Sequence, residues 1–275
     1  MGLFDAYGYQ GKSTLVVGGA TGMGAAIVDV LLDAGATVTM MDRVESTKPG
    51  VTFQPIDLSD RASIEAAAKA VEGPVHALFS CAGVDQDNPV VDKVNFLGHR
   101  LFIELLLEGD KLPRGSAIGM ISSAAGFGWE QNLEKAKQYL AIRDYDEAAQ
   151  WAVDNGATGY LWTKIAINAY VAGEAMSFLK KGIRINAILP GPTDTPLAQA
   201  NAEMWLGFGS DYREEVGVQA ATPLEQAYPL VFLCSDAASA ITGGVIVSDA
   251  GYFASGMAQS FQPAVDTTGF MRSVF

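Results

Sequence analysis

The sequence has few of the residues that form disulfides or hold metals. Its 275 residues include only two cysteines and two histidines. Cys81 and Cys234 lie in the apolar runs "ALFSCAG" and "LVFLCSDAAS", which predicts buried free thiols. Neither the cysteines nor His76 and His99 show the spacing of metal ligands, so we expect no metal site. Free thiols suit a reducing cytoplasm, which is the expected location.

Long apolar runs and an excess of positive charge are also missing. No stretch of about 18 residues is apolar enough to span a membrane. The start, "MGLFDAYGYQGKS", lacks the basic and apolar regions of a signal peptide. Lys and Arg number 18 against 31 Asp and Glu, which gives a net charge of −13. Because such a chain repels phosphate backbones, we expect neither nucleic-acid nor membrane binding.

Short apolar segments alternate with helical segments along the chain. Strands are expected at 13–18, 37–41, 51–56, 75–80, 116–122, 183–189 and 244–249, and helices at 23–34, 60–72, 93–109, 157–181 and 223–235. The strand segments are apolar throughout, which is typical of strands buried on both faces. The alternation predicts an α/β fold of the Rossmann type, a doubly wound seven-stranded parallel sheet with helices on both faces. No linker divides residues 1–275, so we expect a single domain.

A glycine-rich turn joins the first strand to the first helix in "LVVGGATGMGAAIV". Gly18, Gly22 and Gly24 allow a tight turn and let backbone N–H groups approach a pyrophosphate, toward which the helix points its positive end. Asp42 ends the next strand about 20 residues later, where a carboxylate would accept hydrogen bonds from ribose hydroxyls. Because a carboxylate repels a 2′-phosphate, Asp42 predicts NAD(H) over NADP(H), although Arg43 partly offsets that repulsion. A simple glycine turn and a strand-end Asp are the alternatives.

Tyr160 and Lys164 stand four residues apart near the start of the long helix at 157–181. Positions i and i+4 share a helix face. Taken alone, the pair could be a surface contact, or a packed tyrosine beside a lysine that extends to water. The motifs in the rest of the chain decide between these roles and a chemical one.

With the glycine turn, Asp42 and the Tyr–Lys pair in this order, the chain resembles the short-chain dehydrogenase/reductase family over nearly its whole length. Further segments resemble motifs of that family: "IDLSD", "SCAGV" where the family usually has Asn-Asn-Ala-Gly, "VNFLG", "ISSAAG" and "ILPGPTDTP". The resemblance implies an NAD(H) site made of Gly18, Thr21, Gly22, Met23, Gly24, Asp42, Arg43, Asp57, Leu58, Ala82, Gly83, Tyr160, Lys164, Pro190, Gly191, Thr193 and Thr195. It implies catalysis by Asn95, Ser123, Tyr160 and Lys164, with Ser122 as the alternative serine.

The implied reaction interconverts a secondary alcohol and a ketone by hydride transfer, and the proton that moves with the hydride needs an acid or base. A tyrosine pKa of about 10 is too high for a base near neutrality. The Lys164 ammonium and a positive nicotinamide would lower the pKa of Tyr160. Ser123 would hold the substrate oxygen, and Asn95 would tether a water that relays protons from Lys164. Asn95 could instead be a packing residue, and Ser123 a strand-end hydroxyl.

Two segments depart from the family's usual lengths. The insertion 128–157 predicts two short helices, the second capped by Asp144. It could pack on the surface, wall the substrate cleft or set subunit contacts. Segment 197–222 is expected to be a substrate lid that brings Met204, Trp205 and Phe208 to the pocket, which Ser123 also lines. An amphipathic surface helix is the alternative for this segment.

The insertion and the tail "FMRSVF" are similar to those of the bacterial 3α-hydroxysteroid dehydrogenases/carbonyl reductases, which implies a bulky alicyclic or steroid-like small-molecule substrate. A non-catalytic dinucleotide-binding regulator is the alternative function, although it would need none of the four catalytic residues. Subunits of the family commonly pair through the helices at 93–109 and 157–181. Because the insertion leads into the second of these helices, we expect a homodimer through helix 223–235 and the last strand, with a tetramer as the alternative.

Overall fold

A seven-stranded parallel sheet forms the centre of the protein. The computed structural model describes residues 2–273, and its strands pair in the order β3-β2-β1-β4-β5-β6-β7. Their bounds are β1 Ser13–Val17, β2 Thr37–Asp42, β3 Val51–Pro55, β4 Ala77–Ser80, β5 Ala117–Ile121, β6 Arg184–Pro190 and β7 Val245–Ser248. Every neighbouring pair is parallel. The predicted doubly wound sheet is therefore confirmed, and each strand begins and ends within two residues of its expected position.

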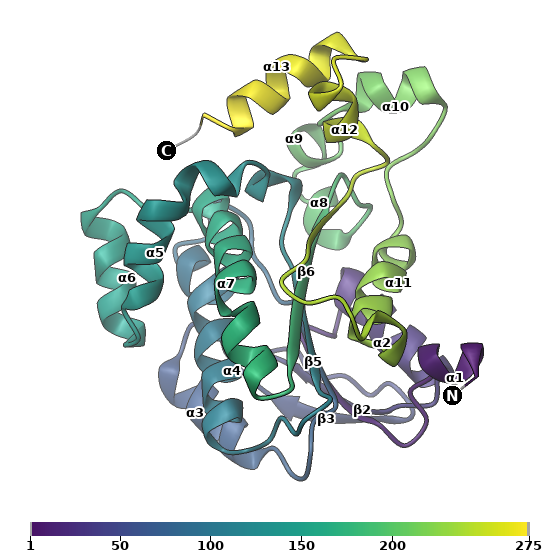
Figure 1. Cartoon of the computed structure of the whole chain (residues 1–275), viewed down its shortest axis with the longest axis vertical. Helices are drawn as coiled ribbons and strands as arrows, with labels where there is room; N and C mark the ends of the chain where they lie inside the picture. Colours follow the sequence, from purple (N-terminus) through teal and green to yellow (C-terminus); the bar gives the residue numbers. More distant parts are fainter. Residues whose placement is uncertain (1, 274–275) are drawn as a thin grey trace.

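Two helical layers enclose this sheet (Figure 1). One contains α2 Gly22–Asp33 and α11 Pro223–Cys234, and the other contains α3 Arg61–Ala70, α4 Gly98–Glu108 and α7 Tyr160–Lys180. Alternate residues of each strand face opposite layers: Leu15 and Val17 belong to the core under α3, α4 and α7, whereas Val16 belongs to the core under α2 and α11. Both faces are buried, which is why the strand segments are apolar throughout.

The helix expected at 93–109 begins with a turn of π-helix. Lys93–Leu97 is the π segment, and α4 continues from Gly98. In a π turn the backbone hydrogen bonds reach five residues back, which widens the helix locally, and such turns recur at functional sites. Asn95 lies within this segment and is buried.

The insertion forms the two predicted helices, α5 Leu133–Ala141 and α6 Tyr145–Asp154, after the 3-10 turn Trp129–Asn132. The Asp144 carboxylate caps α6 as expected and accepts from the N–H groups of Asp146 and Glu147. α5 packs against α7, and α6 packs against the π segment. Figure 1 shows both helices outside the layer of α4 and α7.

Ring packing and ion pairs hold the insertion in place. The Tyr139 ring lies 5.7 Å from that of Phe96 and 5.9 Å from that of Trp162. Arg143 reaches Glu104 of α4 at 2.9 Å and Glu174 of α7 at 3.0 Å. The insertion therefore packs on α7 and on the π segment before α4, while Met176 and Leu179 toward the end of α7 remain exposed.

A third, smaller core lies above the carboxyl ends of the strands. It joins α10 Ser210–Val216 of the lid, and Phe208 before it, to the C-terminal helices α12 Tyr252–Met257 and α13 Gln262–Met271. The other two lid helices are α8 Pro196–Gln199 and α9 Ala202–Trp205. The aromatic centre of this core contains Phe127 and Phe253, whose rings stack at 4.1 Å. The sequence did not predict α12, α13 or the short N-terminal helix α1 Leu3–Tyr7. It did predict the lid as one segment, which the structure divides into three short helices.

Within residues 2–273, no helix is both long and apolar enough to cross a membrane. The same residues contain no group of three or more His, Cys, Asp or Glu side chains that could hold a metal ion. Cys81 and Cys234 are both free thiols, as expected.

Candidate active site

One cavity of about 680 Å³ lies at the carboxyl ends of the strands, beneath the lid and the C-terminal helices. Its lining includes every residue expected to bind the cofactor or the substrate. Of the expected site residues, only Asn95 does not line it. No residue of the insertion 128–157 lines the cavity either, so the expectation that the insertion might wall the cleft is wrong.

The glycine turn is packed too tightly for side chains. A Cβ added to Gly18, whose φ is +84°, would lie 2.3 Å from the backbone nitrogen of Ala82, and one added to Gly24 would lie 1.9 Å from the carbonyl oxygen of Gly18. The turn therefore lies directly against the loop after β4. At the start of α2, the Thr21 side chain makes no cap hydrogen bond. The Thr21 side chain therefore leaves the first N–H groups of α2 available as donors at this end of the cavity, which fits the binding of an anionic pyrophosphate.

Two carboxylates lie at the end of the cavity next to β2 and β3. Asp42 accepts from the backbone N–H groups of Ala20 at 3.0 Å and Val44 at 3.1 Å. Each of its oxygens keeps a further lone pair, which fits the hydroxyls of a ribose. Asp57 accepts from both the N–H and the hydroxyl of Ser59. These bonds fix both carboxylates as acceptors in the cavity wall.

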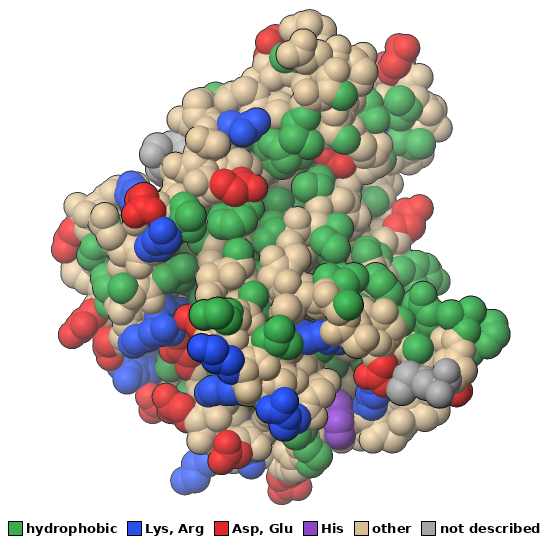
Figure 2. All heavy atoms as spheres, in the orientation of Figure 1, with side chains coloured by type: hydrophobic (Ala, Val, Ile, Leu, Met, Phe, Trp, Pro, Cys, Tyr) green, Lys and Arg blue, Asp and Glu red, His purple; other side chains and the backbone are tan. Residues whose placement is uncertain are grey.

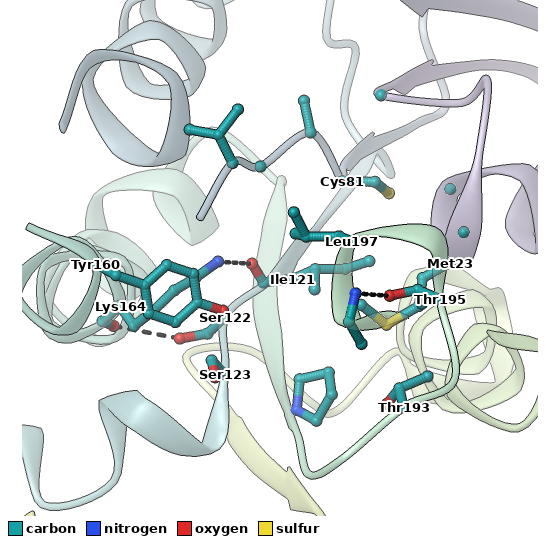
Figure 3. Close-up of a pocket in the computed structure, with 18 of the residues that line it drawn as sticks. Met23, Cys81, Ile121, Ser122, Ser123, Tyr160, Lys164, Thr193, Thr195 and Leu197 are labelled. Atoms are coloured by element: carbon teal, nitrogen blue, oxygen red, sulfur yellow. Dashed lines mark hydrogen bonds between the residues drawn. The ribbon is translucent and has the colours of Figure 1, made fainter. Parts of the chain in front are cut away.

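Two serines, a tyrosine and a lysine come together at the other end of the cavity, where β5 ends and α7 begins (Figure 3). They are Ser122, Ser123, Tyr160 and Lys164. Lys164 is 4% exposed, and its Nζ donates to the carbonyl oxygen of Ile121 at 3.2 Å. The same Nζ lies 5.2 Å from the centroid of the Tyr160 ring. The two side chains share a helix face, as the spacing predicted.

The structure separates the roles of the two neighbouring serines. The Ser122 hydroxyl is buried and donates to the backbone carbonyl of Lys164 at 3.2 Å. The Ser123 hydroxyl accepts from the N–H of Ala125 at 3.1 Å and also hydrogen-bonds the side chain of Tyr160. Ser122 therefore ties β5 to α7, whereas Ser123 lies beside the phenol.

Burial shifts both ionisable groups toward their neutral forms. It raises the pKa of Tyr160 to about 12, and the hydrogen bond to Ser123 lowers it only in part. Burial also lowers the pKa of Lys164 to about 8. Desolvation therefore governs both pKa values in the chain by itself, and the lowering of the Tyr160 pKa by Lys164 together with an oxidised nicotinamide stays a prediction.

Asn95 holds a backbone loop instead of facing the cavity. Its Oδ1 accepts from the N–H of Val84 at 2.8 Å, and its Nδ2 donates to the carbonyl of the same residue at 3.0 Å. His99 holds the same loop, since its Nε2 lies 2.9 Å from the carbonyl oxygen of Ala82. The Asn95 side chain thus holds the Val84 peptide, while its amide keeps one further N–H and one further lone pair, so its predicted link to a water stays a prediction.

The far end of the cavity is formed by the lid and the C-terminus. Trp205 packs against Tyr160 with ring centroids 5.0 Å apart, while Phe208 packs against Tyr252 at 5.1 Å. Further wall residues that the sequence analysis missed are Gln86, Phe270 and Met271. Phe270 and Met271 end α13 and begin the tail "FMRSVF", which the resemblance included without placing it at the cavity. The last two residues of the "FMRSVF" tail lie outside the described residues.

Comparisons with known proteins match nearly the whole chain. A model described as short chain dehydrogenase matches residues 12–133, and one described as enoyl-(acyl carrier protein) reductase matches residues 134–253. A 3-alpha-hydroxysteroid dehydrogenase/carbonyl reductase of Comamonas testosteroni is 29% identical, over 87% of this chain and 96% of the relative. A tropinone reductase homolog of Arabidopsis thaliana is 30% identical, over 88% of this chain and 93% of the relative.

A solved structure extends the likeness to three dimensions. The crystal structure of a 3-alpha-hydroxysteroid dehydrogenase from Pseudomonas sp. B-0831, complexed with NADH, has a TM-score of 0.73 at 27% identity. The match covers 91% of this chain and all of that one. This chain therefore has the same overall fold as a similar protein that was crystallised with NADH.

Proposed function

The chain belongs to the short-chain dehydrogenase/reductase family, and on that premise we propose that it is an NAD(H)-dependent oxidoreductase that interconverts a bulky alicyclic alcohol and its ketone. One observation carries the proposal. A single cavity joins the glycine turn and Asp42 at one end to Ser123, Tyr160 and Lys164 at the other. A hydride carrier held along this cavity would lie with its reactive end beside a proton donor.

The dinucleotide, when bound, supplies or accepts the hydride. The first turn of α2, Asp42 and the loop 190–195 hold it, since all of them line the cavity. Tyr160 donates a proton to the ketone oxygen, or removes one from the alcohol, and Ser123 hydrogen-bonds the same oxygen. The substrate oxygen is then held by two hydroxyl groups that already contact each other.

Lys164 favours the reactive form of Tyr160 through its charge. With a pKa of about 8 it is mostly protonated at neutral pH. Its bond to the Ile121 carbonyl holds Nζ beneath the Tyr160 ring, 5.2 Å from the centroid. The chain alone leaves the phenol with a pKa of about 12, so the positive charge of the oxidised nicotinamide is needed to bring Tyr160 into the range of a base.

Asp42 supports NAD(H) as the preferred cofactor. Its carboxylate lies in the cavity wall and is fixed by two backbone N–H groups. A ribose diol can donate to it, whereas a 2′-phosphate would meet a like charge. Arg43 lines the same end and opposes this preference, so the cofactor ratio is set by these two side chains.

The substrate end of the cavity supports an uncharged apolar substrate. The lid and α13 contribute only apolar side chains there, from Leu197, Met204, Trp205, Phe208, Phe270 and Met271. Gln86 is a neutral polar side chain on the same wall, and Lys164 is the charged lining residue nearest to this end. The residues on either side of Gln86 are Asp85 and Asp87, and together with the net charge of −13 they would repel an anionic substrate.

The test is oxidation of a panel of cyclic alcohols by the purified chain with NAD, followed by the absorbance of NADH. Matched pairs would contain a neutral ring alcohol and the same alcohol carrying a carboxylate. We expect turnover of the neutral, bulky members and a kcat/KM at least about tenfold lower for their carboxylated partners, a difference of about 1.4 kcal/mol. NADH binding without turnover of any alcohol would favour the regulator instead.

We also propose that residues 1–275 form one domain in the cytoplasm and associate as a homodimer. The insertion packs on α7 and on the π segment before α4, whereas α11 exposes Leu224 at 41% and Tyr228 at 55%. On β7, Ile246 and Val247 are more than one-third exposed. Figure 2 shows hydrophobic side chains gathered over α11 and the neighbouring α1. These apolar positions support pairing through α11 and β7, with a tetramer as the alternative.

A further inference from the structure

The carboxylate of Asp92 reaches across 67 residues of sequence to the start of α7. Its Oδ1 accepts from the backbone N–H of Gly159 at 2.8 Å. Asp92 is half-buried and lies at the N-cap of the π segment Lys93–Leu97. Burial raises the pKa of Asp92, and the hydrogen bonds from Gly159 and from its own N–H lower it in part. A charge-assisted bond in such partly dry surroundings is stronger than one at the surface.

Gly159, the residue directly before Tyr160, gives the backbone more conformational freedom than other residues would. Its φ is +90°, and a Cβ added there would meet nothing within 4 Å, so no neighbouring group restricts it by packing. As the N-cap of α7 it has no side chain to hold the first turn. Most helices take that cap from their own N-cap residue. Here Asp92, from another element, accepts from the N–H of the N-cap residue itself, as the N3 carboxylate does in a capping box, and a negative charge at a helix N-terminus is favourable in addition.

The bond to Gly159 is continued into the first turn of α7. The Gly159 carbonyl accepts from the N–H of Thr163 at 3.0 Å, and the Thr163 hydroxyl donates to the carbonyl of Tyr160 at 2.7 Å. The direction in which Tyr160 leaves the backbone therefore depends on where the Gly159 peptide is held.

The segment that begins at Asp92 also fixes a second residue of the cavity wall. One turn later, the Asn95 side chain hydrogen-bonds both the N–H and the carbonyl of Val84, which lines the cavity. The same short segment thus sets the positions of both Val84 and Tyr160. A shift of about 1 Å in a reacting group can lower a rate about a hundredfold.

We propose that Asp92 is a positioning residue of the reaction, which holds the Gly159–Tyr160 peptide so that the phenol stays beside Ser123 and Lys164. Its kinetic consequence rests on the proposed function. Its structural consequence, protection of the Gly159 amide, does not.

Three substitutions separate the position of the acceptor from the charge. Asp92→Ala removes both, Asp92→Asn keeps an acceptor oxygen at the same distance from the backbone, and Asp92→Glu keeps the charge but moves the acceptor by one methylene. Asp144→Ala is the matched control, because Asp144 also caps a helix with its carboxylate but lies away from the cavity. Each variant would be measured for kcat, for the KM of NAD and for hydrogen exchange of a peptide covering 157–164.

We expect Asp92→Ala to lower kcat about tenfold to a hundredfold with the KM of NAD nearly unchanged. Asp92→Glu should also lower kcat, and it tests the idea if the alanine variant does not fold. Asp92→Asn should restore kcat to within about threefold of wild type, and Asp144→Ala should leave it unchanged. Exchange in peptide 157–164 should accelerate in the alanine variant and return to the wild-type rate with asparagine.

Three results would overturn the proposal. They are a wild-type kcat in Asp92→Ala, an asparagine variant as slow as the alanine variant, and unchanged exchange in peptide 157–164. A wild-type enzyme that oxidises no alcohol would refute the proposed function alone. The exchange measurement would then still decide whether Asp92 holds the Gly159 peptide.

Discussion

Substitution of Lys164 by methionine tests how strongly burial acts on the active site. Burial lowers the pKa of Lys164 from its usual 10.5 to about 8. One pKa unit corresponds to about 1.4 kcal/mol, so keeping the ammonium in the fold lowers the free energy of unfolding by about 3 kcal/mol. The folded state binds this proton less tightly than the unfolded state. The penalty is therefore complete below a pH of about 8, and it disappears as the pH rises to 10.5.

Lys164→Met removes that penalty and also the hydrogen bond from Nζ to the Ile121 carbonyl. Leaving a buried carbonyl without its donor costs about 1–3 kcal/mol. Near neutral pH the two effects oppose each other, and we expect the variant to be as stable as wild type or more stable by up to about 2 kcal/mol. At a pH near 10.5 only the lost hydrogen bond remains, so the variant should be the less stable protein. Turnover should be lost at every pH.

Urea unfolding of both proteins across this pH range is the measurement. The difference between their free energies of unfolding is compared at each pH, so that other titrating groups cancel. Lys69→Met, on an exposed face of α3, controls for the loss of one positive charge. If the difference between wild type and Lys164→Met stays constant from neutral pH to about 10, the conclusion that desolvation governs this lysine is refuted.

The remaining predictions concern the proton, the cofactor and the subunits. Tyr160→Phe should abolish turnover and leave NADH binding nearly unchanged, because only the proton donor is removed; steady-state rates within about tenfold of wild type, or about 1.4 kcal/mol in the barrier, would exclude this role. Asp42→Ala should lower the preference for NAD, measured as kcat/KM with NAD divided by kcat/KM with NADP. A wild type that already prefers NADP would mean that the attraction of Arg43 for a 2′-phosphate outweighs the repulsion by Asp42. Light scattering should give a dimer that dissociates when Leu224 and Tyr228 are replaced by charged residues. A crystal structure in which α4 and α7 pack against their symmetry mates would contradict the dimer prediction.

The scaffold could be predicted from the sequence because its signals are local. Every residue of β5, Ala117–Ile121, is buried, so the strand had to be apolar throughout. The glycine turn could also be predicted from the sequence, because a side chain at Gly18 or Gly24 would collide with backbone atoms and only glycine fits there. Wherever the neighbours in sequence set the constraint, the prediction agreed with the structure.

The parts that could not be predicted depend on groups distant in the sequence. Phe270 and Met271 reach the cavity from α13, and the sequence of the tail does not show where in the fold it packs. The bond between Asp92 and Gly159 spans 67 residues and involves a backbone N–H that any residue but proline would offer. The rise in the Tyr160 pKa of the chain alone could not be predicted, because a sequence shows which charges are near but not how dry their surroundings are.

The position of the insertion explains how one chain can combine a fixed reaction centre with an open substrate wall. α5 and α6 line no part of the cavity, yet they pack on α7 and on the π segment, the two elements that Asp92 connects. They therefore pack on these elements without reaching the cavity. The substrate wall is built differently, from short lid helices and α13 around a small aromatic core of their own. Phe270 and Met204 on that wall remain at least half exposed. Changes in that wall can alter which ring systems fit, because neither Asp92 nor the glycine turn depends on it.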